Sequence, residues 1–202
     1  MKLKYLFITA LLSTLLTSCS SVKIQSQRSP AAAGPVSVRY LVVVALDERP
    51  ELRARFENEF VAQWKVANVK CTASHERFKL ADFAGDREEV RRKLTAASVE
   101  TVLVVRATDR ITSVEGSVAP VLYAGELTWA DVDTARYQMF TSGGEITTRL
   151  VVSGKLFRVG DGALLWSSFT ETTLGENYDQ HVVVRKVAGA IAGQLRRDKI
   201  FH

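Results

Sequence analysis

The most constraining feature of this 202-residue sequence is a nearly all apolar run at residues 39–46. The run reads Arg-Tyr-Leu-Val-Val-Val-Ala-Leu and is rich in β-branched residues, which favour extended backbone. Successive side chains of a strand point to opposite faces of its sheet, so a strand that is apolar throughout has both faces covered. The run therefore predicts a central strand with a layer on each side.

An amphipathic segment follows this run. Asp47 is expected to cap a helix whose first turn contains Pro50. The apolar residues of this helix recur every four positions, at Leu52, Phe56, Phe60 and Trp64. Aromatic residues at that spacing are typical of a core, so the stripe predicts packing against the sheet rather than a ligand site.

The first half of the chain continues to alternate between strand and helix patterns. Residues 66–74 predict a short strand, and residues 101–107 predict another β-branched strand. Between them, residues 86–97 predict a second helix, with Asp86 as its cap. This order favours right-handed crossovers and a partly parallel sheet.

The second half predicts mainly antiparallel structure. Residues 108–146 are mixed, with strands expected near 118–125 and 135–141. Residues 147–158 and 163–173 predict a β-hairpin across a Gly-Asp-Gly turn, and a helix is expected over 179–199. We predict one α/β (α+β) domain: a single mixed β-sheet with about three helices, a βαβαβ start, then antiparallel strands and a C-terminal helix.

The N-terminus has the pattern of a secretory signal. Lys2 and Lys4 precede an apolar stretch at residues 5–16, and small residues follow it. The alternative is a membrane anchor helix, which needs about 20 apolar residues. The stretch is too short for that, so it predicts export.

The end of this signal, Leu16-Thr17-Ser18-Cys19, resembles the lipobox of bacterial lipoproteins. The resemblance implies cleavage before Cys19, a diacylglyceryl group on its thiol, and an acyl chain such as palmitate on its new amine. Ser20 follows where enteric lipoproteins retained at the inner membrane tend to carry Asp. The resemblance therefore implies an anchor in the inner leaflet of the outer membrane, facing the periplasm.

The predicted processing changes the composition. Removal of residues 1–18 lowers the 27 basic residues to 25 against 22 acidic ones, so the net charge falls from +5 to +3. Residues 20–37 are rich in Ser, Pro and Ala without helical or strand period. We expect a signal peptide at 1–18, a lipidated Cys and flexible tether at 19–38, and a periplasmic domain at 39–202.

A looser resemblance covers the domain. It opens with Tyr-Leu-Val-Val-Val-Ala-Leu, closes with Gly-Asp-Gly-Ala-Leu-Leu-Trp-Ser and ends in a helix. This pattern resembles small bacterial lipoproteins whose fold is similar to the N-terminal domain of TolB and the periplasmic domain of the curli-secretion lipoprotein. The resemblance implies a role in envelope assembly and transfers no functional residue.

The sequence offers few residues for catalysis or metal binding. It has no Gly-x-Ser-x-Gly elbow, and Cys71, four residues before His75, is expected to be a core thiol. The histidines are far apart, and Asp131-Val132-Asp133 lacks the rest of a calcium loop. We expect no enzymatic activity, no cofactor and no metal, and an exported protein does not meet nucleic acid.

The mixed segment at 108–146 contains the candidate binding edge. Its aromatic residues are of the types enriched in interface cores: Tyr123, Trp129, Tyr137 and Phe140. The alternative is that these residues complete the sheet and cover the core.

Three functional hypotheses remain. The first is a non-enzymatic protein-interaction or accessory module of an envelope assembly, anchored at Cys19 and bound to an envelope protein. The second is a carrier or sensor of an apolar or glycolipid ligand, which requires a sizeable cavity in the domain. The third is a hydrolase, which requires a histidine and a carboxylate beside Ser74 or Cys71.

Overall fold

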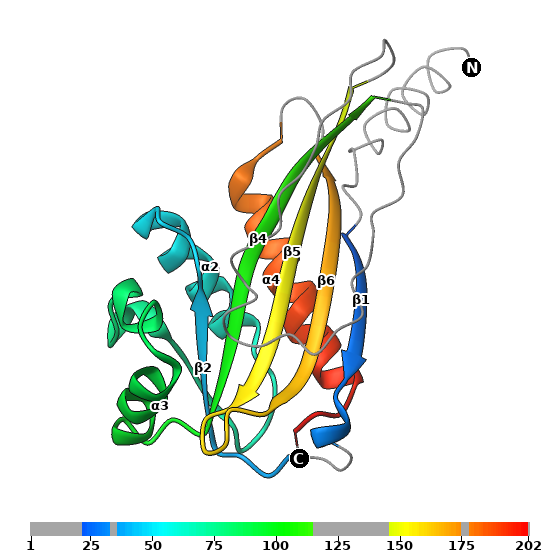
Figure 1. Ribbon diagram of the computed structural model, residues 1–202. Coiled ribbons are helices and arrows are strands. Elements are labelled where there is room, and N and C mark those ends of the chain that lie inside the picture. Colours follow the sequence, from blue (N-terminus) through cyan, green and yellow to red (C-terminus); the bar gives the residue numbers. More distant parts are fainter. Residues whose placement is uncertain (1–21, 33–35, 115–145, 175–177, 202) are drawn as a thin grey trace, which may run out of the picture.

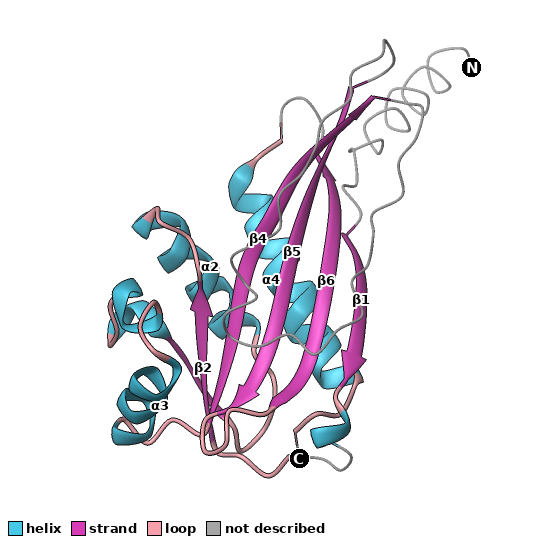
Figure 2. Ribbon diagram, in the orientation of Figure 1, coloured by secondary structure: helices cyan, strands magenta, loops and turns pink. Residues whose placement is uncertain are grey.

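The computed structural model describes residues 22–32, 36–114, 146–174 and 178–201. These residues form one mixed six-stranded sheet and three α-helices, which confirms the predicted fold class (Figures 1 and 2). The strands are β1 (Val22–Arg28), β2 (Tyr40–Ala45), β3 (Lys70–Ala73), β4 (Thr101–Val114), β5 (Ile146–Arg158) and β6 (Leu164–Leu174). The α-helices are α2 (Pro50–Gln63), α3 (Arg87–Ala96) and α4 (Gln180–Arg197). Short 3-10 helices are η2 (Pro30–Ala32), η3 (Ser74–Glu76) and η4 (Leu80–Phe83).

The order of strands across the sheet is β1-β6-β5-β4-β2-β3. β2 lies parallel to both β3 and β4, as the predicted βαβαβ start requires. The remaining neighbours, β4 with β5, β5 with β6 and β6 with β1, are antiparallel. The hairpin between β5 and β6 turns at Gly162, whose φ of 70° is a conformation that glycine adopts without steric cost.

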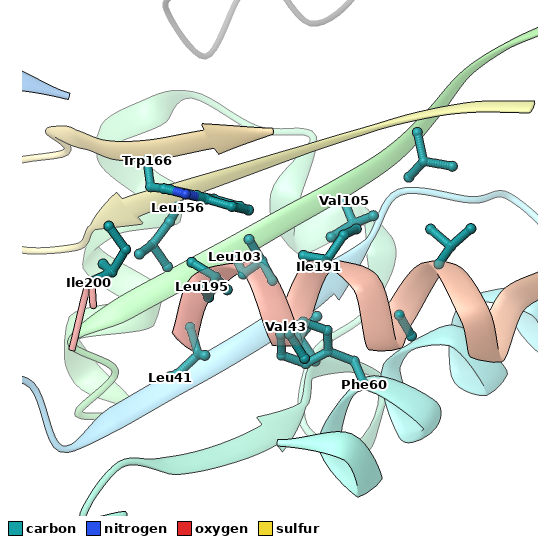
Figure 3. Close-up of a cluster of buried hydrophobic side chains, with 14 of the residues drawn as sticks. Leu41, Val43, Phe60, Leu103, Val105, Leu156, Trp166, Ile191, Leu195 and Ile200 are labelled. Atoms are coloured by element: carbon teal, nitrogen blue, oxygen red, sulfur yellow. The ribbon is translucent and has the colours of Figure 1, made fainter. Parts of the chain in front are cut away.

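Helices cover the sheet on both faces, as the apolar β2 run predicted. One face packs against α2 and α4, and its core contains the fully buried Leu41, Phe60, Leu156, Trp166 and Ile191 (Figure 3). The other face packs against α3 and η4 through Val42, Val44, Val90, Leu94 and Phe157. β2 therefore has side chains in both cores, which explains why its sequence shows no polar alternation.

The first strand corrects the predicted boundary at residue 39. Residues 22–28, expected to be tether, form β1 and pair with β6 over seven residues, from Val22 opposite Thr172 to Arg28 opposite Trp166. Val22 and Ile24 point toward the main core, while alternate residues are exposed. The expectation of flexible backbone is wrong here, because this alternation is a strand pattern within a Ser-rich and Pro-rich composition.

Further hydrogen bonds hold this segment and the residues after it to the domain. The Ser26 hydroxyl donates to Asp198 Oδ2 at 2.7 Å, and the Trp166 indole donates to the same oxygen at 2.7 Å. Further along, Val36 N donates to Ile200 O at 2.8 Å. The segment is therefore bonded to β6 and to the C-terminal end of α4.

Smaller differences concern the ends of elements. Pro50 is the first residue of α2, as predicted, but Arg49 occupies the cap position and Asp47 instead accepts the Arg49 N–H at 2.9 Å. Asp86 caps α3 as predicted, accepting from Glu88 N at 3.1 Å. β4 extends past the predicted residues 101–107 to Val114. The strands expected near 118–125 and 135–141 lie outside the described residues.

Candidate functional site

A cluster of buried polar side chains lies where β2 and β3 end. Arg53 and Glu57 come from consecutive turns of α2, and Ser74 and His75 come from η3, which follows β3. After β2 the chain continues on the face of the sheet that α2 covers. After β3 it continues on the opposite face, which η4 and α3 cover. In open α/β sheets, such a divergence at the carboxyl ends of parallel strands is where ligands bind. We call these four residues the buried polar cluster.

Glu57 is the centre of the buried polar cluster. Its side chain is fully buried, and its Oε1 accepts hydrogen bonds from Ala45 N at 2.9 Å, Arg53 Nε at 3.1 Å and Ser74 Oγ at 2.7 Å. Its Oε2 accepts from His75 N at 2.7 Å and lies 2.8 Å from His75 Nδ1. The last residues that pair between β2 and β3 are Val43 and Ala73. Beyond this pair, the carboxylate accepts from the backbone N–H groups of Ala45 and His75.

Arg53 supplies the balancing positive charge. Its side chain is only 8% exposed, and its Nη2 donates to Ser74 Oγ at 2.7 Å and to Phe78 O at 3.0 Å. Buried charges are stable only when they are paired and hydrogen-bonded. The Arg53–Glu57 pair meets this condition and connects α2, the end of β2 and η3.

The arrangement of the cluster differs from that of a catalytic triad. A nucleophilic serine needs a base that takes its proton, with a third group orienting that base. The Ser74 hydroxyl donates directly to Glu57, and His75 occupies the other oxygen of the same carboxylate. Ser74 is fully buried, and His75 is the one cluster side chain with substantial exposure, at 25%. The structure brings the carboxylate and histidine of the hydrolase hypothesis near Ser74, but in an order that gives no proton relay.

Sequence reasoning singled out Ser74 and His75 but missed Arg53 and Glu57. The predicted stripe of this helix placed the buried line at Leu52, Phe56, Phe60 and Trp64. The helix instead buries Arg53, Phe56, Glu57 and Phe60, which are spaced by three and four residues. The available signal was an Arg and a Glu at i and i+4 in line with two phenylalanines, where a solvent-facing pair was the simpler interpretation.

Cys71 on β3 packs against the main core, as expected of a core thiol. Burial raises the pKa of its thiol to about 12, so the thiol stays protonated at neutral pH. Because the thiolate is the nucleophilic form, this environment disfavours nucleophilic chemistry at Cys71.

Hollows bounded by described side chains include two beside the sheet. The larger, about 60 Å³, is lined by Leu46, Phe83, Val104, Arg106, Ser153, Lys155 and Phe157. The other, about 10 Å³, lies between α3 and the β5–β6 turn. Sites for drug-sized ligands occupy roughly 300–1,000 Å³. Neither hollow offers the sizeable cavity that the carrier hypothesis requires.

The outward-facing residues of β1 and β6 share one face of the sheet, which we call the outer face. It lies opposite α4 and comprises Lys23, Gln25, Gln27, Ser167, Phe169, Glu171 and Thr173. Phe169 is 40% exposed, and Glu171 pairs with Arg149 of β5 at 3.1 Å. Among the elements that the structure describes, α3 and η4 pack on this side of the sheet, in one hydrophobic cluster with β2, β4 and Phe157 of β5.

The predicted lipidation and binding residues are outside the part of the chain that the structure describes. These are Leu16, Thr17, Ser18 and Cys19 of the lipobox and Tyr123, Trp129, Tyr137 and Phe140 of the candidate binding edge. Within the described ranges, no group of three or more His, Cys, Asp or Glu residues is placed to hold a metal ion. No described helix combines the length and apolar character needed to cross a bilayer.

Comparisons by sequence identify no relatives: no family model matches the chain, and no curated protein matches it. Solved structures give low similarity. A PelC dodecamer from Paraburkholderia phytofirmans aligns over 87% of this chain and 98% of its own, at 10% identity and a TM-score of 0.47. The lipoprotein GNA1162 from Neisseria meningitidis aligns over 79% of this chain and 99% of its own, at 14% identity and a TM-score of 0.39. A minor lipoprotein from Acinetobacter baumannii aligns over 80% of this chain and 94% of its own, at 13% identity and a TM-score of 0.35. Similarity at this level assigns neither a function nor a functional residue to this chain.

Proposed function

We propose that this chain is a lipoprotein anchored in the outer membrane through Cys19, whose periplasmic α/β domain is a non-enzymatic interaction module of an envelope assembly. The observation that carries the proposal is the lipobox Leu16-Thr17-Ser18-Cys19, placed directly after a short apolar segment with a basic start. One myristoyl chain holds a protein only marginally at a membrane, whereas two or three acyl chains hold it stably.

The geometry of the domain favours binding over catalysis. The buried polar cluster uses its carboxylate, guanidinium and hydroxyl to join secondary-structure elements, and the thiol of Cys71 is held protonated. The outer face, in contrast, presents polar side chains around the exposed Phe169 ring. An aromatic residue surrounded by polar groups is a common arrangement in protein interfaces.

Processing and anchoring are tested by Cys19→Ser. The variant should keep its signal peptide, carry no lipid label and be released from outer-membrane fractions. A matched Cys71→Ser variant should be processed and anchored normally, because Cys71 lies on β3 inside the domain. Normal maturation and membrane recovery of Cys19→Ser would contradict the proposed anchor.

The interaction role is tested by photo-cross-linking in cells. A benzophenone amino acid at position 169 should give one discrete, reproducible adduct with an envelope protein, and the adduct should disappear in the Cys19→Ser background. The control carries the same group at exposed Arg92 on α3 and should give no such adduct. Equal adducts at both positions, or none at 169, would argue against binding through the outer face.

A further inference from the structure

The predicted anchor lies unusually close to the folded domain. Only residues 20 and 21 separate Cys19 from Val22, the first residue of β1. A chain spans at most about 3.6 Å per residue, so the Cα of Val22 lies within about 11 Å of the Cα of Cys19. If Cys19 carries lipid, the start of β1 is therefore held near the lipid headgroups.

The long hairpin of β4 and β5 extends beyond this point. Val22 pairs with Thr172, and Thr172 pairs with Leu150 of β5. β5 begins four residues before Leu150, at Ile146, which pairs with Val114, the last residue of β4. At about 3.3 Å per residue, the hairpin projects about 13 Å past the start of β1. We call residues 109–114 and 146–150 the β4–β5 arm, which is at the top of Figure 1.

The direction of β1 relates the arm to the membrane. β1 runs from Val22 away from the arm, and the starts of β1, β5 and α4 are all at the arm end of the molecule (Figure 1). The end of β1 that the anchor holds near the lipid is therefore the end nearest the arm.

We propose that the β4–β5 arm and the adjoining ends of β1 and β6 rest on the phospholipid headgroups, with the β5–β6 turn at Gly160–Gly162 directed away from the membrane. This proposal rests on the proposed lipid anchor. With the strands upright on the membrane, the arm's projection of about 13 Å exceeds the maximum span of about 11 Å from Cys19 to Val22, so the arm reaches the headgroups. The described charges near this end include Lys23, Asp179 and the Arg149–Glu171 ion pair, whose signs are mixed. We therefore expect the orientation on zwitterionic lipid and at high salt as well.

The test measures the distance of single labelled positions from the bilayer. Mature lipidated protein in a Cys71→Ser background carries a donor dye at Thr173→Cys, near the arm, or at Asp161→Cys in the β5–β6 turn, and is reconstituted into phosphatidylcholine vesicles with a rhodamine-labelled lipid. Both side chains are exposed. About nine residues of β6, or about 30 Å along the strand, separate the two labelled positions. Energy transfer should be about twofold or more higher at position 173 than at position 161.

A spacer variant is the matched control. Twelve Gly and Ser residues inserted between Ser21 and Val22 give a flexible connection of roughly 20 Å root-mean-square length, so the two efficiencies should converge. Equal efficiencies at both positions without the insertion, or higher efficiency at 161, would overturn the proposed orientation. Vesicle binding by a Cys19→Ser chain that lacks residues 1–18 would instead show that the lipid anchor itself is wrong, so the two failures are distinguishable.

Discussion

Replacing Glu57 by glutamine tests the buried polar cluster most directly. The amide has the size of the carboxylate, so the change removes a charge and turns an acceptor into a donor without opening a cavity. Five nitrogen or oxygen atoms lie within hydrogen-bonding distance of the two carboxylate oxygens. If the amide NH2 takes the place of Oε1, Ala45 N, Arg53 Nε and Ser74 Oγ lose their acceptor. If it takes the place of Oε2, the backbone N–H of His75 loses its acceptor.

The expected cost is about 3–5 kcal/mol of unfolding free energy, the range for removing one partner of a buried ion pair. Arg53, 8% exposed, would keep its charge next to a neutral amide. Because domains are typically stable by about 5–15 kcal/mol, the variant should remain folded but much weakened. With a urea m-value of about 2 kcal/mol/M, the unfolding midpoint should fall by about 2 M.

The assay is urea unfolding of the mature chain, followed by tryptophan fluorescence, with Asp161→Asn as control. The control breaks the exposed Arg158–Asp161 pair and should cost less than about 1 kcal/mol. Arg53→Met should also cost less in the Glu57→Gln background than alone, since Arg53 then has no counter-charge to lose. A cost of under about 1 kcal/mol for Glu57→Gln, or strict additivity with Arg53→Met, would refute the account of the cluster.

Three further predictions concern other parts of the domain. Because the folded pKa of Cys71 is raised from 9.0 to about 12, its contribution to stability is present below pH 9 and is lost as pH rises toward 12. At pH 9, iodoacetamide should alkylate the native thiol about 500-fold more slowly than the urea-unfolded one, and similar rates would contradict the burial. Asp198→Ala should cost about 2–3 kcal/mol and speed hydrogen exchange in β1, since Ser26 and Trp166 lose their shared acceptor; unchanged β1 protection would contradict this. Gly154→Val should lower the thermal midpoint at a cost of about 1–3 kcal/mol, because a Cβ there would lie 2.9 Å from Ser168 Oγ; an unchanged midpoint would contradict tight packing under α4.

Local periodicity was sufficient to predict most of the regular elements. The β2 run, the capped start of α3, the β5–β6 hairpin and α4 each have a pattern that is complete within one segment. The parallel pairing of β2 with β3 and β4 follows from the alternation of strands and helices together with the preference for right-handed crossovers. These features depend on backbone geometry and on which face is apolar, both of which the sequence displays directly.

The buried polar cluster could not be predicted in the same way. On a helix, Arg53 and Glu57 read as a solvent-exposed pair because charged side chains are rarely buried. Their burial is stabilised by groups 12 to 25 positions away along the chain, namely Ala45 N, the Ser74 hydroxyl and Phe78 O. These partners come together only after β2, β3 and α2 have packed, so the interaction is tertiary and leaves little trace in local sequence.

β1 shows how the same limit affects function. A strand at the edge of a sheet needs apolar residues on one face only, and Val22 and Ile24 supply them between polar neighbours that resemble a linker. Its stability comes from pairing with β6 and from the hydrogen bond of Ser26 to Asp198, and both partners are distant in sequence. Once this segment is a strand, the proposed anchor is followed by only two connecting residues instead of a long leash. A substitution that weakens β1, such as Asp198→Ala, should therefore change the domain's orientation on the membrane as well as its stability.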